Sequence, residues 1–169
     1  MLLIVMSLVF AFVLALDLIT KYLSVSLDFN VVIIPNLLKF LQSYNTGAAF
    51  GMLDDKPWAK YFFIISTLLV CAVIIFYIVF NFVKKNKVSK WLGIALSLVL
   101  SGALGNLYDR IFIGKVRDFI FFFYNTRIFP FIFNVADSAL VIGVIMIIIY
   151  LLFLDKDAVF KKGNKQNGN

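Results

Sequence analysis

The sequence predicts an all-α integral membrane protein with four transmembrane helices and a small extracytoplasmic sheet between the first two helices. Three observations support this fold class. The 169-residue chain is 63% hydrophobic and 15% charged, whereas charged residues make up about a quarter of a typical soluble domain. Its sequence contains four long uncharged runs. Its lysines gather in short segments between and after those runs, as expected of loops on the cytoplasmic side of a membrane.

The four uncharged runs cover residues 1–16, 61–83, 91–108 and 138–154. A helix that crosses a hydrocarbon core of about 30 Å needs roughly 20 mostly apolar residues, and each run reaches or approaches that length with its neighbours. We therefore predict transmembrane helices at residues 2–25, 60–83, 90–112 and 136–154. Strands are disfavoured because the runs are long and lack alternation. The first run has neither the basic start nor the small-residue cleavage site of a signal peptide, so we expect it to be retained.

The basic residues predict the orientation, because Lys and Arg in short loops favour the cytoplasmic side. Four lysines lie within residues 84–90, and further lysines follow the last helix. We expect one membrane domain, residues 1–155, and a cytoplasmic tail, residues 156–169, with both termini in the cytoplasm. The net charge of +7 then reflects this bias and attraction to anionic lipids. No nucleic-acid partner is expected.

The outer segments are then residues 26–59 and 113–135. In the first, the β-branched run Val31–Ile34 stops at Pro35, and Gly47 and Gly51 suit turns or close approaches, so we expect a small sheet on the membrane surface. In the second, the aromatic run 119–124 is too short to span and is expected to dip into the membrane interface near Asp118.

The composition excludes several kinds of catalytic site. The chain has no His, no Glu and one Cys, Cys71, which we expect to serve packing. A Ser-His-Asp triad, a Cys-His pair, a His-based zinc site and an internal disulfide are therefore impossible. No metal or cofactor is expected. All nine acidic residues are Asp, so acid–base catalysis by a conventional side chain must use Asp, Lys, Tyr or the thiol.

Ionisable groups in membrane segments are costly and mark partners or function. Asp17 and Lys21 are spaced i, i+4 and are expected to form an ion pair that orients the first helix. Asn106, Asp109 and Arg110 share one face of the third helix. The simplest explanation of the last two is a local pair, with Arg110 reaching towards the interface.

Asp118 and Asp137 both follow predicted outer segments and should lie at the same depth near the outer leaflet. Each alone has a simpler explanation, as an interfacial charge paired with Arg117 and as a helix N-cap. Together, two close carboxylates can share one proton. Their negative charges would repel each other, so the two groups do not easily ionise at the same time. The ionised Asp can accept a proton from water while the protonated one polarises a carbonyl. The composition permits aspartyl proteolysis of this kind.

The motifs resemble those of the lipoprotein signal peptidases, also called signal peptidase II. The resemblance covers residues 10–150 in five segments: D-x-x-T-K (17–21), N-x-G-A-A-F (45–50), G-x-x-G-N-x-x-D-R (102–110), V-x-D-F (116–119) and F-N-x-A-D-S (133–138). It implies a bacterial inner-membrane aspartyl peptidase that removes the signal peptide of prolipoproteins just before a diacylglyceryl-modified cysteine. It also implies a small outer β-cradle, an outer loop over the site, contact with membrane phospholipid, and inhibition by globomycin, a cyclic peptide.

The resemblance also implies roles for single residues. The catalytic pair falls on Asp118 and Asp137. The residues at the family's substrate-binding positions are Asn45, Gly47, Asn106, Arg110, Asn134 and Ala136. The polar residues at the positions that shape the site are Asp17, Lys21 and Asp109. One departure is Arg117, where an apolar residue is commoner; a cation there could lower the pKa of Asp118 or bind a lipid phosphate. The uncharged N-terminus is a second departure.

Three other functions stay open. A small carrier could use Asp17, Asp118 and Asp137 as proton relays. A Ser–Lys peptidase would need Lys21 as the base for Ser24 or Ser26, although the neighbouring Asp17 makes Lys21 a poor base. A structural assembly factor without chemistry would tolerate the loss of both aspartates, Asp118 and Asp137.

Overall fold

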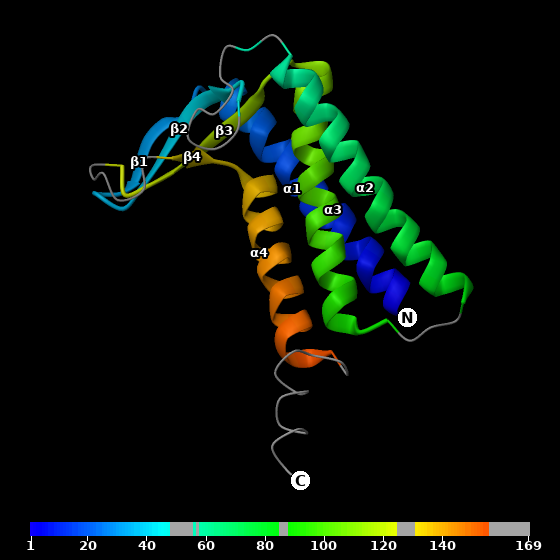
Figure 1. Ribbon diagram of the computed structural model, residues 1–169. Coiled ribbons are helices and arrows are strands. Elements are labelled where there is room, and N and C mark those ends of the chain that lie inside the picture. The colour runs from blue at the N-terminus through cyan, green and yellow to red at the C-terminus, as the bar shows by residue number, and fades with distance from the viewer. Residues whose placement is uncertain (48–55, 57, 85–87, 125–130, 156–169) are drawn as a thin grey trace.

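The computed structural model describes residues 1–47, 56, 58–84, 88–124 and 131–155 of the chain (Figure 1). The elements, in chain order, are α1 (Leu2–Ser26), β1 (Asn30–Ile34), β2 (Leu38–Asn45), α2 (Ala59–Val83), α3 (Lys90–Phe112), β3 (Val116–Phe122), β4 (Ile132–Phe133), α4 (Val135–Ile149) and a π-helical turn, η2 (Tyr150–Leu154). Several sequence predictions lie outside the described residues: the tail 156–169, the motif residues 48–50, and Gly51.

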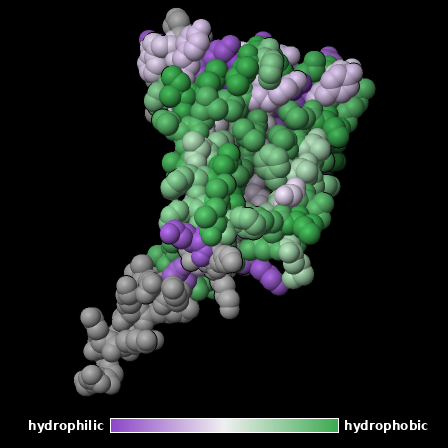
Figure 2. Space-filling view, turned by 90° about the vertical axis from the view of Figure 1, so that its right-hand side faces the viewer, coloured by the Kyte–Doolittle hydropathy of each residue, from purple (hydrophilic) through white to green (hydrophobic). Residues whose placement is uncertain are grey.

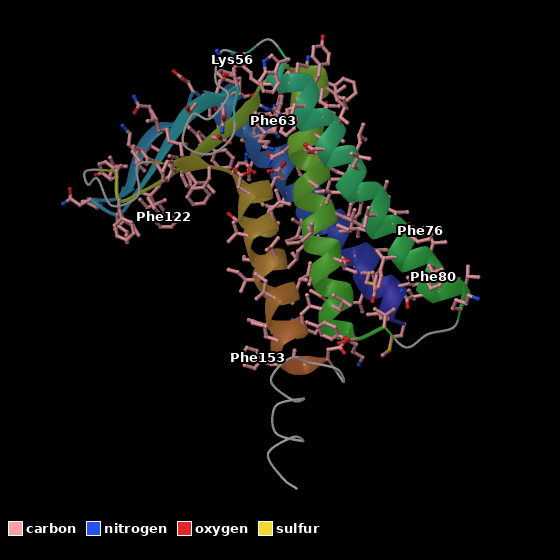
Figure 3. The ribbon with its side chains drawn as sticks, in the orientation of Figure 1. Lys56, Phe63, Phe76, Phe80, Phe122 and Phe153 are labelled. Atoms are coloured by element: carbon pink, nitrogen blue, oxygen red, sulfur yellow. The ribbon has the colours of Figure 1, made fainter. Side chains whose placement is uncertain are left out.

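All four helices are long and apolar enough to cross a membrane, and their bounds agree with the predicted ranges to within one residue once η2 is joined to α4. The face drawn in the space-filling view is mostly apolar along the bundle, with polar residues at its two ends (Figure 2). Side chains such as Phe76 and Phe80 project outwards from α2 (Figure 3). This surface suits a lipid solvent, where apolar side chains need no cover.

Helix α3 is the centre of the bundle. In its most apolar stretch 72% of the residues are buried, compared with 11% in each of the other three spans. Small residues allow this: a Cβ at Gly102 would lie 2.8 Å from Leu140 Cγ, and a Cβ at Gly143 would lie 2.9 Å from the carbonyl oxygen of Ala95. Helices α3 and α4 therefore approach at backbone distance, as small residues permit in membrane bundles.

A four-stranded antiparallel sheet in the order β1-β2-β3-β4 lies at the end of the bundle opposite the N-terminus (Figure 1). The predicted sheet after the first helix is confirmed. The prediction missed its other half, because most of the aromatic run expected to dip into the interface forms β3. Strand β2 pairs with β3, with Ser43 opposite Asp118, and β3 pairs with β4, with Ile120 opposite Phe133. The sheet thus ties the two outer segments together beside the helix ends.

Candidate active site

A cluster of buried polar side chains lies where the sheet meets α1, α3 and α4. Ordinarily such groups avoid the interior unless they are hydrogen-bonded or paired. The cluster contains Asp17, Lys21, Asn106, Asp109, Arg117, Asp118 and Asn134, none of them more than 9% exposed. These residues come from three helices or their caps and from β3, so the site forms only when the outer segments and the bundle come together.

Asp118 and Asp137 are linked by one residue, Asn134. The Asn134 side chain donates a hydrogen bond of 2.6 Å to Asp118 Oδ1. The Asn134 side-chain oxygen accepts from the backbone N–H of Asp137 at 2.9 Å, while the Asn134 backbone N–H donates to Asp137 Oδ2 at 3.1 Å. This reciprocal pattern is a capping box at the start of α4. The prediction that Asp137 itself caps the helix is wrong, because Asn134 is the N-cap and Asp137 lies at position N3 of this box. The same contacts hold Asp137 against Asn134, which also contacts Asp118.

A second amide, that of Asn106 on α3, extends the network. Its nitrogen donates to Asp137 Oδ1 at 2.7 Å. Its oxygen accepts from Lys21 Nζ at 2.9 Å and from the Asn134 side chain at 3.1 Å. Since an ammonium can only donate, Lys21 fixes which end of the Asn106 amide faces Asp137.

The predicted ion pair between Lys21 and Asp17 is confirmed, with 2.8 Å between Nζ and Oδ2 and both side chains fully buried. Asp17 also accepts a hydrogen bond of 2.8 Å from the backbone N–H of Ala136. A Cβ at Gly105 would collide with Asp17 Oδ2, so the glycine makes room for this carboxylate. The pair therefore joins α1 to α3 and to the first turn of α4.

The predicted local pairs of the other charges are wrong. Asp109 pairs with Arg117, at 2.7 Å between Oδ1 and Nη2, and lies 3.7 Å from Lys21 Nζ. Arg110 instead donates to the carbonyl oxygen of Gly47 at 3.4 Å and stacks over the Phe63 ring, 4.9 Å from its centroid. Figure 3 shows Phe63 near the sheet end of α2. Sequence reasoning missed Phe63, because nothing in the chain links it to the polar motifs.

Asn45 and Gly47 lie at the end of β2, over the carboxylates. The Asn45 side chain donates to Asp118 Oδ2 at 3.2 Å, and its oxygen accepts from the backbone N–H of Gly47 at 3.0 Å. Each predicted substrate-binding residue thus lies in or beside this cluster. Ala136 differs from the others, because its exposed fraction is 0% and its side chain packs against α3 near Gly105.

The placement of Lys21 also bears on the Ser–Lys alternative. The Ser24 hydroxyl donates to the backbone oxygen of Lys21 at 2.9 Å, while Lys21 Nζ faces Asp17 and Asn106. Ser26 is exposed at the end of α1. A serine activated by a lysine needs its hydroxyl near the amine, and this arrangement directs the two groups apart.

Comparison with known proteins identifies the family. The family model described as signal peptidase (SPase) II matches residues 9–153 of the chain. The chain belongs to the signal peptidase II family. It is 40% identical to a lipoprotein signal peptidase of Pseudomonas syringae pv. tomato over 139 residues, which cover 80% of this chain and 78% of that protein.

Solved structures agree with this family assignment. Two structures described as a bacterial membrane enzyme solved by the in meso method, at 2.3 Å and 1.9 Å resolution, are 39% and 38% identical to the chain, with TM-scores of 0.74 and 0.73. Both alignments cover 88% of this chain, and they cover 87% and 93% of those chains. As a member of the signal peptidase II family, the chain is a protease with a multi-pass membrane fold.

Burial, and after it the charge of Asp137, raises the pKa of Asp118 from 3.8 to about 7, against the opposing effect of the Asn45 and Asn134 amides. This corrects the expectation that Arg117 would lower this pKa. The corresponding expectation of a lipid phosphate on Arg117 also fails, because the Arg117 side chain is 11% exposed and already paired.

This shift makes the stability of the signal peptidase II chain depend on pH. The folded protein keeps the Asp118 proton up to about pH 7, whereas the unfolded chain releases it near pH 3.8. Stability therefore falls as pH rises between these two values and levels off above them. The total loss is at most about 4 kcal/mol, since each unit of difference between the two pKa values corresponds to about 1.36 kcal/mol. Melting temperatures of the purified protein from about pH 4 to about pH 9 test this, with Asp118→Asn as the control. The slope should be smaller in the variant; equal slopes would assign the pH dependence to other groups.

Proposed function

We propose that this chain removes the signal peptide of prolipoproteins by aspartyl catalysis, with Asp118 and Asp137 as the catalytic pair. The observation that carries the proposal is the placement of Asn134, which contacts both the buried Asp118 and the half-buried Asp137. The name of the Pseudomonas syringae relative, a lipoprotein signal peptidase, supports the substrate class. The motif resemblance supports cleavage just before a diacylglyceryl-modified cysteine.

The two aspartates take different roles. The raised pKa makes Asp118 the partner that carries the shared proton near neutral pH, so its O–H donates to the scissile carbonyl oxygen. Asp137 accepts hydrogen bonds from the Asn106 side chain and the Asn134 backbone, and its carboxylate accepts a proton from the attacking water. Water oxygen adds to the carbonyl carbon, which gives a tetrahedral diol. As the C–N bond breaks, Asp137 returns its proton to the leaving amine and Asp118 recovers one from the diol.

The fold suits a substrate that is itself embedded in the membrane. The site lies at the sheet end of the bundle, opposite the N-terminus (Figure 1). With the positive-inside orientation, this end faces out of the cytoplasm, with both termini inside and the site near the outer leaflet of a bacterial inner membrane. Water reaches this depth, while the apolar helix faces accept acyl chains of substrate and phospholipid. Globomycin-type cyclic peptides, as substrate mimics, would occupy the same site.

The test compares two precursors that differ only in lipid. The purified full-length protein is incubated with a diacylglyceryl-modified precursor peptide and with its unmodified counterpart, and the products are identified by mass spectrometry. We expect cleavage of the modified peptide alone, at the bond before the cysteine, and inhibition by globomycin. Equal cleavage of both peptides would contradict recognition of the lipid. No cleavage of either, with proton flux in liposomes, would favour the relay alternative.

A further inference from the structure

Arg117 precedes Asp118 on β3, and its side chain is turned into the protein. Successive residues of a strand point to opposite faces, yet the first four residues of β3 are all buried. The strand is therefore enclosed on both faces at this point. Asp118 meets Asn45 and Asn134, while Arg117 meets Asp109 at the end of α3.

Arg117 gives Asp109 three hydrogen bonds. Its backbone N–H donates to Oδ2 at 2.9 Å, its Nε to Oδ2 at 3.2 Å and its Nη2 to Oδ1 at 2.7 Å. A guanidinium matches a carboxylate in this two-pronged way because its donors have a fixed planar geometry. Only the short turn through Gly114, with φ +87°, separates the two elements. The contact therefore fixes the start of β3 against α3.

The backbone of Arg117 is also part of the site. Its carbonyl oxygen accepts from the Asn134 side chain at 3.3 Å, and the same Asn134 nitrogen donates to Asp118 Oδ1 at 2.6 Å. The backbone of Arg117 is thus held at its N–H by Asp109 and at its carbonyl oxygen by Asn134. A shift of Arg117 would carry the Asp118 carboxylate with it.

Charge balance gives Arg117 a second effect. The buried groups Asp17, Lys21, Asp109 and Arg117 form two cations and two anions. Without Arg117, Lys21 would be the one cation of this group for both carboxylates, Asp17 at 2.8 Å and Asp109 at 3.7 Å. Lys21 would then be drawn towards Asp109 and away from Asn106, whose amide faces Asp137.

We propose that Arg117 is a positioning residue of this peptidase. Its guanidinium holds Asp109, sets the place of Asp118 at the start of β3, and leaves Lys21 free to orient the Asn106 amide towards Asp137. This inference rests on the proposed catalytic pair. Arg117 acts through Asp109 and touches neither the substrate nor the reacting atoms.

The test measures kcat and KM separately on the lipid-modified precursor, at a temperature where each variant is folded. Arg117→Met removes the charge, and Arg117→Lys keeps the charge but loses the planar pair of guanidinium donors. We expect kcat to fall about 10- to 100-fold in Arg117→Met, as for a small misplacement of a reacting group, with a smaller fall in Arg117→Lys. KM should change less than kcat in both. Lys115→Met is the matched control, because Lys115 lies over the Tyr44 ring at 3.7 Å, outside this network, and its kcat should stay near wild type.

The outcomes separate this inference from the proposed function. Wild-type kcat in Arg117→Met, with an inactive Asp118→Asn, would overturn the positioning role alone. An active Asp118→Asn would overturn the catalytic pair first. If Arg117→Met does not fold, Arg117→Lys is the deciding variant. A wild-type kcat in Arg117→Lys would show that the paired guanidinium donors are not needed. In an Asp109→Asn background, Arg117→Met should cost little further kcat, and a full additional loss would show that Arg117 does not act through Asp109.

Discussion

Replacing either Asp118 or Asp137 by Asn is expected to abolish cleavage of the lipid-modified precursor. An amide has nearly the shape of a carboxyl group, but it can neither accept a proton from water nor deliver one to the carbonyl oxygen. Acid–base groups of this kind contribute about 10²- to 10⁴-fold in rate, and the two aspartates act on one water and one carbonyl. We therefore expect each single variant to lose about 10³-fold or more in kcat, and the double variant to lose little beyond that, because residues that act as a unit are not additive.

Asp28→Asn is the matched control for this experiment. Asp28 is exposed between α1 and β1, at the same end of the bundle as the site, and its φ of +44° is one that Asn tolerates. The same chemical change there should leave kcat within about twofold, as surface substitutions usually do. Melting temperatures near that of the wild type would show that the inactive variants are folded. Cleavage at a near wild-type rate by folded Asp118→Asn or Asp137→Asn would contradict the aspartyl mechanism.

The helices were predictable because the membrane makes their pattern simple. Each must be long and apolar, and charge marks its ends, so residues 60–83 and 90–112 could be read from the sequence almost to the residue. The central place of α3 could also have been inferred, since Gly102 and Gly105 favour close packing.

The sheet was only half predictable, for a physical reason. Val31–Ile34 has the β-branched composition of a strand, but the run 119–124 is aromatic without alternation, and of its residues in β3 Phe119 is buried while 120–122 are half-buried. Its partner β2 lies far away in the sequence. When a distant partner sets the register of a strand, the strand's own sequence shows little of the pattern from which strands are predicted.

The sequence indicated residues that the fold brings together, but it indicated one of their charged pairs and not the others. The spacing of Asp17 and Lys21 indicated the right partner because both lie on one helix. The same rule failed for Asp109, whose partner Arg117 lies beyond a turn. No sequence pattern indicated that Asn134 would contact both aspartates, because that contact needs β3 beside the first turn of α4.

Lys21→Met is expected to cause the largest loss of stability. Lys21 is fully buried and contacts Asp17, Asp109 and Asn106. Methionine fills similar space but leaves Asp17 without its cation, and removing one partner of a buried ion pair costs about 3–5 kcal/mol. Unfolding of the purified variant, followed by its melting temperature, measures this. Catalysis should also fall in any folded fraction, because the Asn106 amide loses the donor that fixes its orientation towards Asp137.

A second substitution separates charge from packing. In the double variant Asp17→Asn/Lys21→Met the buried carboxylate is gone, while the oxygen of the introduced amide can still accept from the Ala136 N–H. The double variant should therefore be more stable than Lys21→Met alone; if it is less stable, the uncompensated charge is not the cause. Ser24→Ala is the control, since that hydroxyl donates only within its own helix turn, to the Lys21 backbone oxygen. Its loss should cost within about 1 kcal/mol and leave kcat unchanged, whereas a Ser–Lys peptidase would lose all activity. The pattern of the three variants thus distinguishes a lysine that orients an aspartate site from a lysine that serves as a base.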